Sequence, residues 1–138
     1  IRRLWQVDYI PIVNENDTVS IEEIMLGDND KLSALVAVIT EADLLVLVSD
    51  IDGIFDRNPH LHPDAQLITE VNNLESVEAC IEEKESTLGT GGMSSKIHAA
   101  EICMENGVEM WIMNGQRPNY IINAMGNRIP FTRFVKKQ

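Results

Sequence analysis

Two clusters of amide and carboxylate side chains occupy positions where a chain could bind a small polar substrate. Asn14-Glu15-Asn16-Asp17 follows an apolar run at residues 9–13, and Gly27-Asp28-Asn29-Asp30 opens another apolar run at residues 32–39. In α/β proteins such side chains gather beyond the carboxyl ends of the strands, where ligands bind. Asn and Asp also serve as helix caps and turn residues, because their side chains bond nearby backbone N–H groups. The repetition of an Asn-Asp ending in two such contexts favours a binding site over two unrelated caps.

A glycine-rich stretch, Gly89-Thr90-Gly91-Gly92, precedes Met93-Ser94-Ser95-Lys96. Glycines let successive N–H groups face one concavity, and a helix N-terminus adds partial positive charge, so the stretch suits an anion. We expect Ser94 and Ser95 to cap a helix whose first turn carries Lys96, a mobile cation that could reach a transferred phosphate. The spacing is neither that of a P-loop nor that of a dinucleotide fingerprint. A flexible loop is the alternative, but the hydroxyls and the lysine favour a phosphate site.

Acceptor-rich residues follow the continuous apolar run at residues 44–48, which predicts a central parallel strand buried on both faces. The run ends at Ser49-Asp50-Ile51-Asp52-Gly53, where Ser49 and Asp50 would lie beside the phosphate site. A β-turn with Gly53 at positive φ is the alternative, and it is compatible with contacts to a nucleotide's ribose or adenine. Asp30, at a predicted helix start, could hold either a lysine or magnesium in a phosphoryl-transfer site.

Strand and helix patterns alternate along the chain and predict an α/β fold, a three-layer αβα sandwich with a mostly parallel sheet. The expected strands are residues 7–13, 44–48, 66–71, 108–113 and 131–134, with a short β excursion at 18–21 and a loop at 54–66. The expected helices are residues 30–41, 74–83, a segment from Lys96 onward, and 119–125. One face of the third helix is apolar and consists of Ile97, Ala100, Cys103 and Met104, so we expect Cys103 to be a core residue. Gly107 suits the position after the end of this helix.

Composition bounds the class of protein. The 138 residues are enough for one domain with a real core, and 44% hydrophobic and 24% charged residues are ordinary for a soluble globular protein. A formal charge of −11 argues against binding nucleic acid, which requires Lys and Arg to neutralise phosphates. No apolar run is long enough for a membrane helix. Two cysteines without a CxxC pair indicate a reduced, cytoplasmic protein without structural zinc. The start at Ile1 suggests an excerpt of a longer polypeptide.

Five segments together resemble glutamate 5-kinase in order and separation: residues 11–17, 27–34, 49–53, 89–96 and 114–115. Ser-Asp-Ile-Asp-Gly is shared with other amino-acid kinases, whereas the NEND and GDND pair with GTGGM is more specific. The resemblance covers nearly the whole chain. It implies the amino-acid kinase fold, which is similar to that of carbamate kinase. It also implies that residues 1–138 form a single, incomplete domain, the C-terminal, nucleotide-binding portion of the kinase domain.

The resemblance implies ATP-dependent phosphorylation of the L-glutamate γ-carboxylate to L-glutamyl 5-phosphate, the first step of proline biosynthesis. Mg²⁺ would bridge phosphate oxygens, no metal site made by the protein alone is expected, and the full-length enzyme would be a homo-oligomer. The implied glutamate contacts are Asn14, Asp17 and Asn29. Asp30 would organise the catalytic lysines and Lys96 would stabilise the phosphate in transfer. The implied ATP/ADP contacts are Ser49, Asp50, Thr90, Gly91, Gly92, Met93, Ser94, Ser95 and Lys96.

Other functions remain open at this point. A different amino-acid kinase would act on a carboxylate, a carbamate or a nucleotide phosphate. A non-catalytic nucleotide-binding or regulatory module would be complete at this length, and a degenerate fragment would fold poorly because of an open sheet edge. The family's N-terminal part, which carries another catalytic lysine, is missing, so we expect the chain alone to be inactive.

Overall fold

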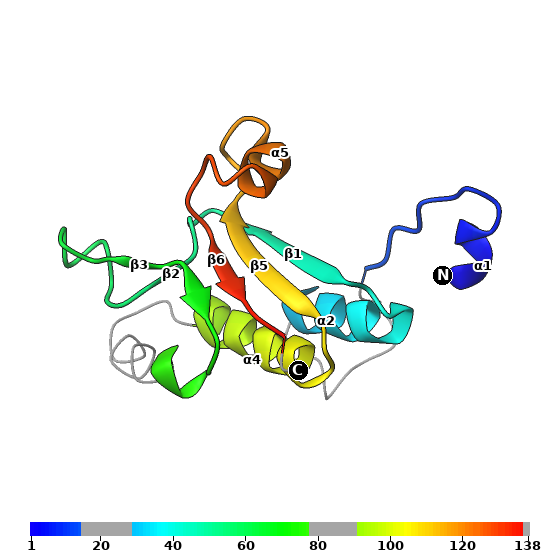
Figure 1. The fold of residues 1–138 in the computed structure, drawn as a ribbon, viewed down its shortest axis with the longest axis horizontal. Coiled ribbons are helices and arrows are strands. Elements are labelled where there is room, and N and C mark those ends of the chain that lie inside the picture. Colours follow the sequence, from blue (N-terminus) through cyan, green and yellow to red (C-terminus); the bar gives the residue numbers. More distant parts are fainter. Residues whose placement is uncertain (15–28, 78–90, 137–138) are drawn as a thin grey trace.

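A mixed four-stranded sheet forms the centre of the fold in the computed structural model, which describes residues 1–14, 29–77 and 91–136 (Figure 1). The strand order is β1 (Leu44–Ser49), β5 (Glu109–Asn114), β6 (Thr132–Phe134) and β4 (Glu70–Val71). The pairs β1–β5 and β4–β6 are parallel, and β5–β6 is antiparallel.

Helices lie on both sides of this sheet. The helices α2 (Asn29–Thr40) and α4 (Gly91–Glu105) lie side by side against one face, and α5 (Tyr120–Met125) lies on the other side (Figure 1). The predicted three-layer α/β fold with a mostly parallel sheet is therefore confirmed, as are the predicted helices at residues 30–41 and 119–125 and the strands at 108–113 and 131–134.

The two long helices each turn directly into a strand. Ala42 N donates to Ala37 O after α2, and Val108 N donates to Cys103 O after α4. Gly107 has the positive φ of 73° that suits the residue after a helix end, as predicted. Each helix runs back antiparallel to the strand that follows it, because the connections are this short. Since β1 and β5 are parallel, the N-termini of both helices lie at the edge of the sheet where these strands end.

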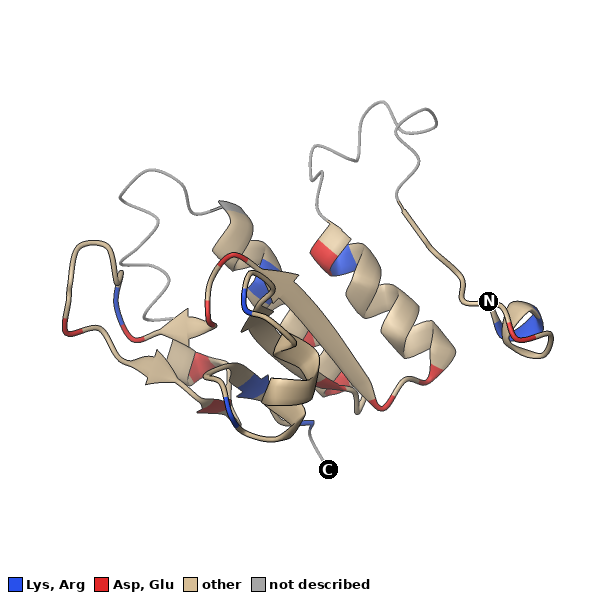
Figure 2. Ribbon diagram, turned by 90° about the horizontal axis from the view of Figure 1, so that it is seen from above, with Lys and Arg blue, Asp and Glu red and all other residues tan. Residues whose placement is uncertain are grey.

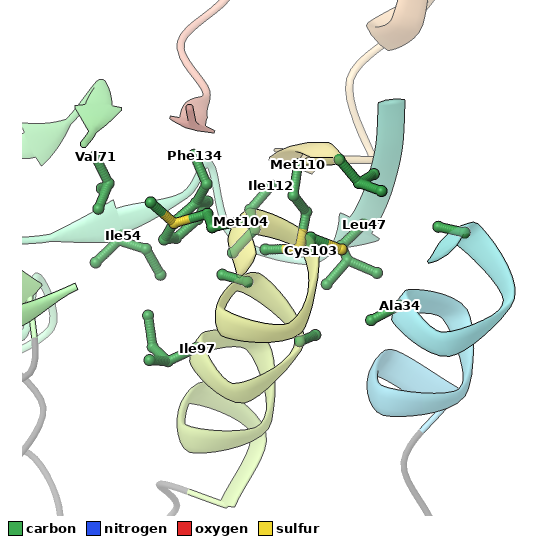
Figure 3. Close-up of a cluster of buried hydrophobic side chains, with 14 of the residues drawn as sticks. Ala34, Leu47, Ile54, Val71, Ile97, Cys103, Met104, Met110, Ile112 and Phe134 are labelled. Atoms are coloured by element: carbon green, nitrogen blue, oxygen red, sulfur yellow. The ribbon is translucent and has the colours of Figure 1, made fainter. Parts of the chain in front are cut away.

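The core lies between α4 and the sheet (Figure 3). The predicted apolar face of the helix is buried, with Ile97, Ala100, Cys103 and Met104 packed in a cluster that also contains Met110, Ile112 and Phe134 from the strands. Burial raises the pKa of the Cys103 thiol to about 11, so the thiol is protonated at neutral pH. Cys103 is a core residue, as predicted.

The predicted strand at residues 7–13 is wrong. The chain starts with one helical turn, α1 (Arg2–Trp5), and Tyr9 N donates back to Leu4 O. Ile10 and Ile12 are 90% and 96% exposed, and no described strand pairs with this segment. An apolar run becomes a strand only where a neighbour accepts and donates its backbone hydrogen bonds. Within the described residues this segment has no such neighbour.

Two other strand predictions need correction. β1 is an edge strand of the described sheet rather than a central one, and Val48 is half exposed. The predicted strand at 66–71 divides into β3 (Leu67–Ile68) and β4, and β3 pairs antiparallel with β2 (Ile54–Phe55), inside the predicted loop. An apolar run indicates which faces of a strand are apolar, but it does not indicate how many strands pair with it in the sheet. Of the predicted helix at 74–83, residues 75–77 are helical and 78–83 lie outside the described residues, as does the excursion at 18–21.

Thr132 joins the small β2–β3 sheet to the central sheet. Its side chain is completely buried, and Oγ1 donates to Ile68 O and accepts from Ile54 N, both at 2.7 Å. Gly53 approaches the same hydroxyl with a φ of +151°, which confirms the predicted positive φ. A Cβ at Gly53 would lie 2.3 Å from Thr132 Oγ1 and 2.9 Å from Thr132 N. The turn after β1 therefore depends on the absence of a side chain at this position.

Gly53→Ala should lower the free energy of unfolding by about 1–3 kcal/mol, because alanine disfavours this φ and collides with Thr132. Urea unfolding without nucleotide measures the change. Gly92→Ala is the matched control, since a Cβ there meets no atom of the described chain within 4 Å. We expect the control to keep or raise the free energy of unfolding, by up to about 1 kcal/mol, because alanine suits a helix better than glycine. Equal losses in both variants would contradict the close approach.

Candidate active site

Four segments that carry polar residues meet at one edge of the sheet. The parallel register pairs Ser49 with Asn114, so β1 and β5 end side by side. The N-termini of α2 and α4 lie at the same edge, and charged residues of the two helices gather there (Figure 2). Each helix N-terminus presents backbone N–H groups and the positive end of its dipole. The arrangement favours a negatively charged ligand.

An ion pair between Lys96 and Asp30 crosses from α4 to α2. Lys96 Nζ lies 2.9 Å from Asp30 Oδ2, and the two side chains are only 15% and 19% exposed. Nζ also donates to Gly92 O at 3.4 Å. Of the two partners that the sequence left open for Asp30, lysine or magnesium, the described structure provides the lysine. An ammonium group is thereby held between the starts of two helices.

Gly91 and Gly92 lie within the helix instead of preceding it. α4 starts at Gly91, so Ser94 and Ser95 lie within the helix and Lys96 lies in its second turn. The prediction that the two serines cap the helix is wrong, because the glycines adopt helical geometry and extend it toward its N-terminus. The first-turn N–H groups, which have no partner within a helix, therefore belong to residues 91–94. The predicted phosphate-binding residues Gly91, Gly92 and Met93 are thus the first turn of α4.

The turn that contains Ser49 and Asp50 is fixed to the end of β5. Gly115 N donates to Ser49 O at 2.9 Å, and Asn114 Nδ2 donates to Asp50 O at 3.3 Å. Within the turn, Ser49 Oγ donates to Asp50 Oδ1 at 3.2 Å. Both predicted nucleotide contacts therefore lie at the same sheet edge as the two helix N-termini.

Asp52 and Arg117 form a two-pronged ion pair that the sequence analysis did not identify as part of the site. Arg117 Nε donates to Asp52 Oδ1 at 2.8 Å and a terminal nitrogen donates to Oδ2 at 2.6 Å. The hydrogen bond from Arg117 holds the pKa of the Asp52 carboxyl below its usual value, against the opposing effect of burial. No local pattern could have joined two residues that are 65 positions apart.

The segment that leads into the first Asn-Asp cluster lies near the start of α2. Pro11 and Val13 line a cavity of about 330 Å³ together with Asn29, Leu32 and Ser33. Asn14 follows Val13 directly and is exposed, and Asn29 is the first residue of α2. Asp17 and Thr90 lie outside the described residues.

Neither a metal centre nor a membrane helix is present in the part of the chain that the structure describes. No group of three or more His, Cys, Asp or Glu side chains could hold a metal ion within residues 1–14, 29–77 and 91–136. None of the helices in these ranges has the length and apolar character of a membrane span.

Curated relatives with high similarity are glutamate 5-kinases, which confirms the resemblance. The chain is 51% identical over 129 residues to the enzyme of Clostridium acetobutylicum, a match that covers 93% of this chain and 48% of that protein. It is 44% identical over 135 residues to the enzyme of Pasteurella multocida, a match that covers 97% of this chain and 37% of that protein. The chain therefore spans about half or less of the length of these relatives.

Solved structures share the fold. A substrate complex of isopentenyl phosphate kinase matches with a TM-score of 0.63 and 18% identity, over 96% of this chain and 50% of that one. Carbamate kinase from Giardia lamblia bound to AMP-PNP matches with a TM-score of 0.59 and 22% identity, over 80% of this chain and 32% of that one. Residues 1–114 match the model of the amino acid kinase family. The chain therefore belongs to the amino acid kinase family.

Proposed function

We propose that the protein containing this chain uses ATP to phosphorylate the γ-carboxylate of L-glutamate, forming L-glutamyl 5-phosphate for proline biosynthesis. The observation that carries the proposal is the contact between Lys96 and Asp30, 2.9 Å long, at the edge where two helix N-termini and two strand ends meet. Identities of 44–51% to proteins named glutamate 5-kinase support glutamate as the acceptor.

The nucleotide would bind across the start of α4 and the turn that follows β1. Backbone N–H groups of Gly91, Gly92 and Met93 would donate to phosphate oxygens. Ser49 and Asp50 would contact the nucleoside part from the neighbouring strand end. The remaining proposed contacts are Thr90, Ser94, Ser95 and Lys96.

Lys96 would act on the phosphate during transfer. In this reaction a γ-carboxylate oxygen attacks the γ-phosphorus of ATP, the bond to the bridging oxygen breaks, and ADP leaves. Such transfers depend on positioning and charge neutralisation more than on covalent chemistry with the enzyme. The Lys96 ammonium would stabilise negative charge on the phosphoryl oxygens, and Asp30 would hold that ammonium in place.

Glutamate would bind at the start of α2. The amides of Asn14 and Asn29 suit its carboxylates, and the carboxylate of Asp17 suits its ammonium group. The positive end of the α2 dipole would favour an anionic group beside Asn29.

Mg²⁺ would be held mainly by phosphate oxygens of ATP, where it neutralises their charge. Magnesium commonly binds with few protein ligands in such sites. We further assign the chain to the nucleotide-binding portion of a single kinase domain in a cytoplasmic homo-oligomer, on the basis of the similarity to glutamate 5-kinases.

Lys96→Ala in the full-length protein should lower kcat by about a hundredfold or more and leave KM for glutamate within about twofold, because the lysine acts mainly on the transition state. Steady-state kinetics with both substrates varied separates the two constants. Lys31→Ala is the control, since it removes an exposed lysine next to Asp30. Comparable losses in kcat and glutamate affinity would contradict the assigned role of Lys96.

Asp50→Ala should weaken MgADP binding by about tenfold, because it removes a contact to the nucleoside without disturbing α4. Isothermal titration calorimetry of the full-length protein measures this affinity directly. Asp64→Ala removes an acidic side chain from the distant β2–β3 connection, where Asp64 pairs with Arg57, and should leave the affinity unchanged. An unaltered MgADP affinity in Asp50→Ala would remove Asp50 from the nucleotide site.

A further inference from the structure

The turn at residues 49–53 is held at several points by residues outside it. Gly115 N and Asn114 Nδ2 donate to the carbonyl oxygens of Ser49 and Asp50, at 2.9 Å and 3.3 Å. Beyond the turn, Ile54 N donates to the buried Thr132 hydroxyl. The first of these contacts comes from Gly115, which begins the segment after β5, and the second comes from Asn114, the last residue of β5.

Arg117, in that same segment, supplies the charged contact. Its guanidinium binds both carboxylate oxygens of Asp52, at 2.8 Å and 2.6 Å, and thereby joins position 117 to the middle of the turn. A two-pronged pair of this kind fixes orientation as well as distance, which a lysine cannot reproduce. The Asp52 side chain is 23% exposed and that of Arg117 is 40% exposed, so the pair lies at the rim of the sheet edge.

We propose that Arg117 is a positioning residue for the nucleotide, because it fixes the turn that presents Ser49 and Asp50. The inference rests on the proposed nucleotide-binding role of these two residues. Without the ion pair between Arg117 and Asp52, nucleotide binding would have to order the turn, and that ordering lowers the affinity for the nucleotide. Glutamate would bind at the start of α2, on a different element. Loss of the ion pair should therefore weaken binding of the nucleotide and not of glutamate.

The alternative is that the pair contributes only to folding. Exposed and half-exposed ion pairs contribute little to stability. This alternative therefore predicts small changes that are similar for nucleotide and glutamate binding. The chain offers a matched control in Arg133, whose guanidinium lies 2.8 Å from Glu109 with a side chain that is 44% exposed. Glu109 begins β5, at the end of that strand opposite to Asn114.

The test is titration of the full-length protein with MgADP, together with kinetics in ATP and glutamate. Arg117→Ala should raise the Kd for MgADP and KM for ATP by about tenfold, while KM for glutamate stays within about twofold. Arg117→Lys should recover only part of the affinity for MgADP, because lysine keeps the positive charge but cannot bind both carboxylate oxygens as the guanidinium does. Arg133→Ala should leave all three constants unchanged. Arg117→Ala in an Asp52→Ala background should cause no further loss.

An MgADP affinity that is unchanged in folded Arg117→Ala would overturn the inference, as would an equal loss in Arg133→Ala or a parallel rise in KM for glutamate. If Arg117→Ala fails to fold, Arg117→Lys decides by the same criteria. A wild-type protein that does not bind MgADP would overturn the inference and the nucleotide site together. A wild-type protein that binds MgADP but does not phosphorylate glutamate would overturn the proposed function alone, and the affinities of the variants would still decide the role of Arg117.

Discussion

The parallel pairing of β1 with β5 is the constraint on which the candidate site depends. Each strand is preceded by a helix that runs antiparallel to it, with only a tight turn between them. Once the two strands are parallel and in register from Leu44–Glu109 to Ser49–Asn114, both helix N-termini must lie at the edge where the strands end. Residues that are far apart in sequence therefore meet without any long loop having to place them.

The candidate site gathers backbone N–H donors and a lysine on a strongly acidic chain. The formal charge is −11, yet the starts of α2 and α4 combine two helix dipoles with the Lys96 ammonium. Asp30 balances the charge of that ammonium, and the low exposure of both side chains restricts where the ammonium can move. A phosphate that approaches this edge would meet oriented donors that need little reorganisation, which is the condition for electrostatic catalysis.

Sequence periodicity predicted the features that local interactions determine. The buried face of α4 and the positive φ of Gly107 follow from residues within a few positions of each other. The failures involve partners that are distant in sequence. Residues 7–13 have the composition of a strand, but no described strand pairs with them. Among the described strands, β1 has one neighbour where a buried strand has two. The pair of Asp52 with Arg117 left no local signal. The polar motifs, in contrast, marked Asp30 and Lys96 as candidates and left lysine open as one of two partners for Asp30.

A double-mutant cycle on kcat tests most directly whether Asp30 acts through Lys96. The full-length protein would be assayed as wild type, Asp30→Asn, Lys96→Ala and the double variant, under saturating ATP and glutamate. If Asp30 serves to hold the ammonium, its loss matters only while Lys96 is present, so the double variant should be about as slow as Lys96→Ala alone. Losses that multiply in the double variant would show that the two residues act independently and would contradict the account.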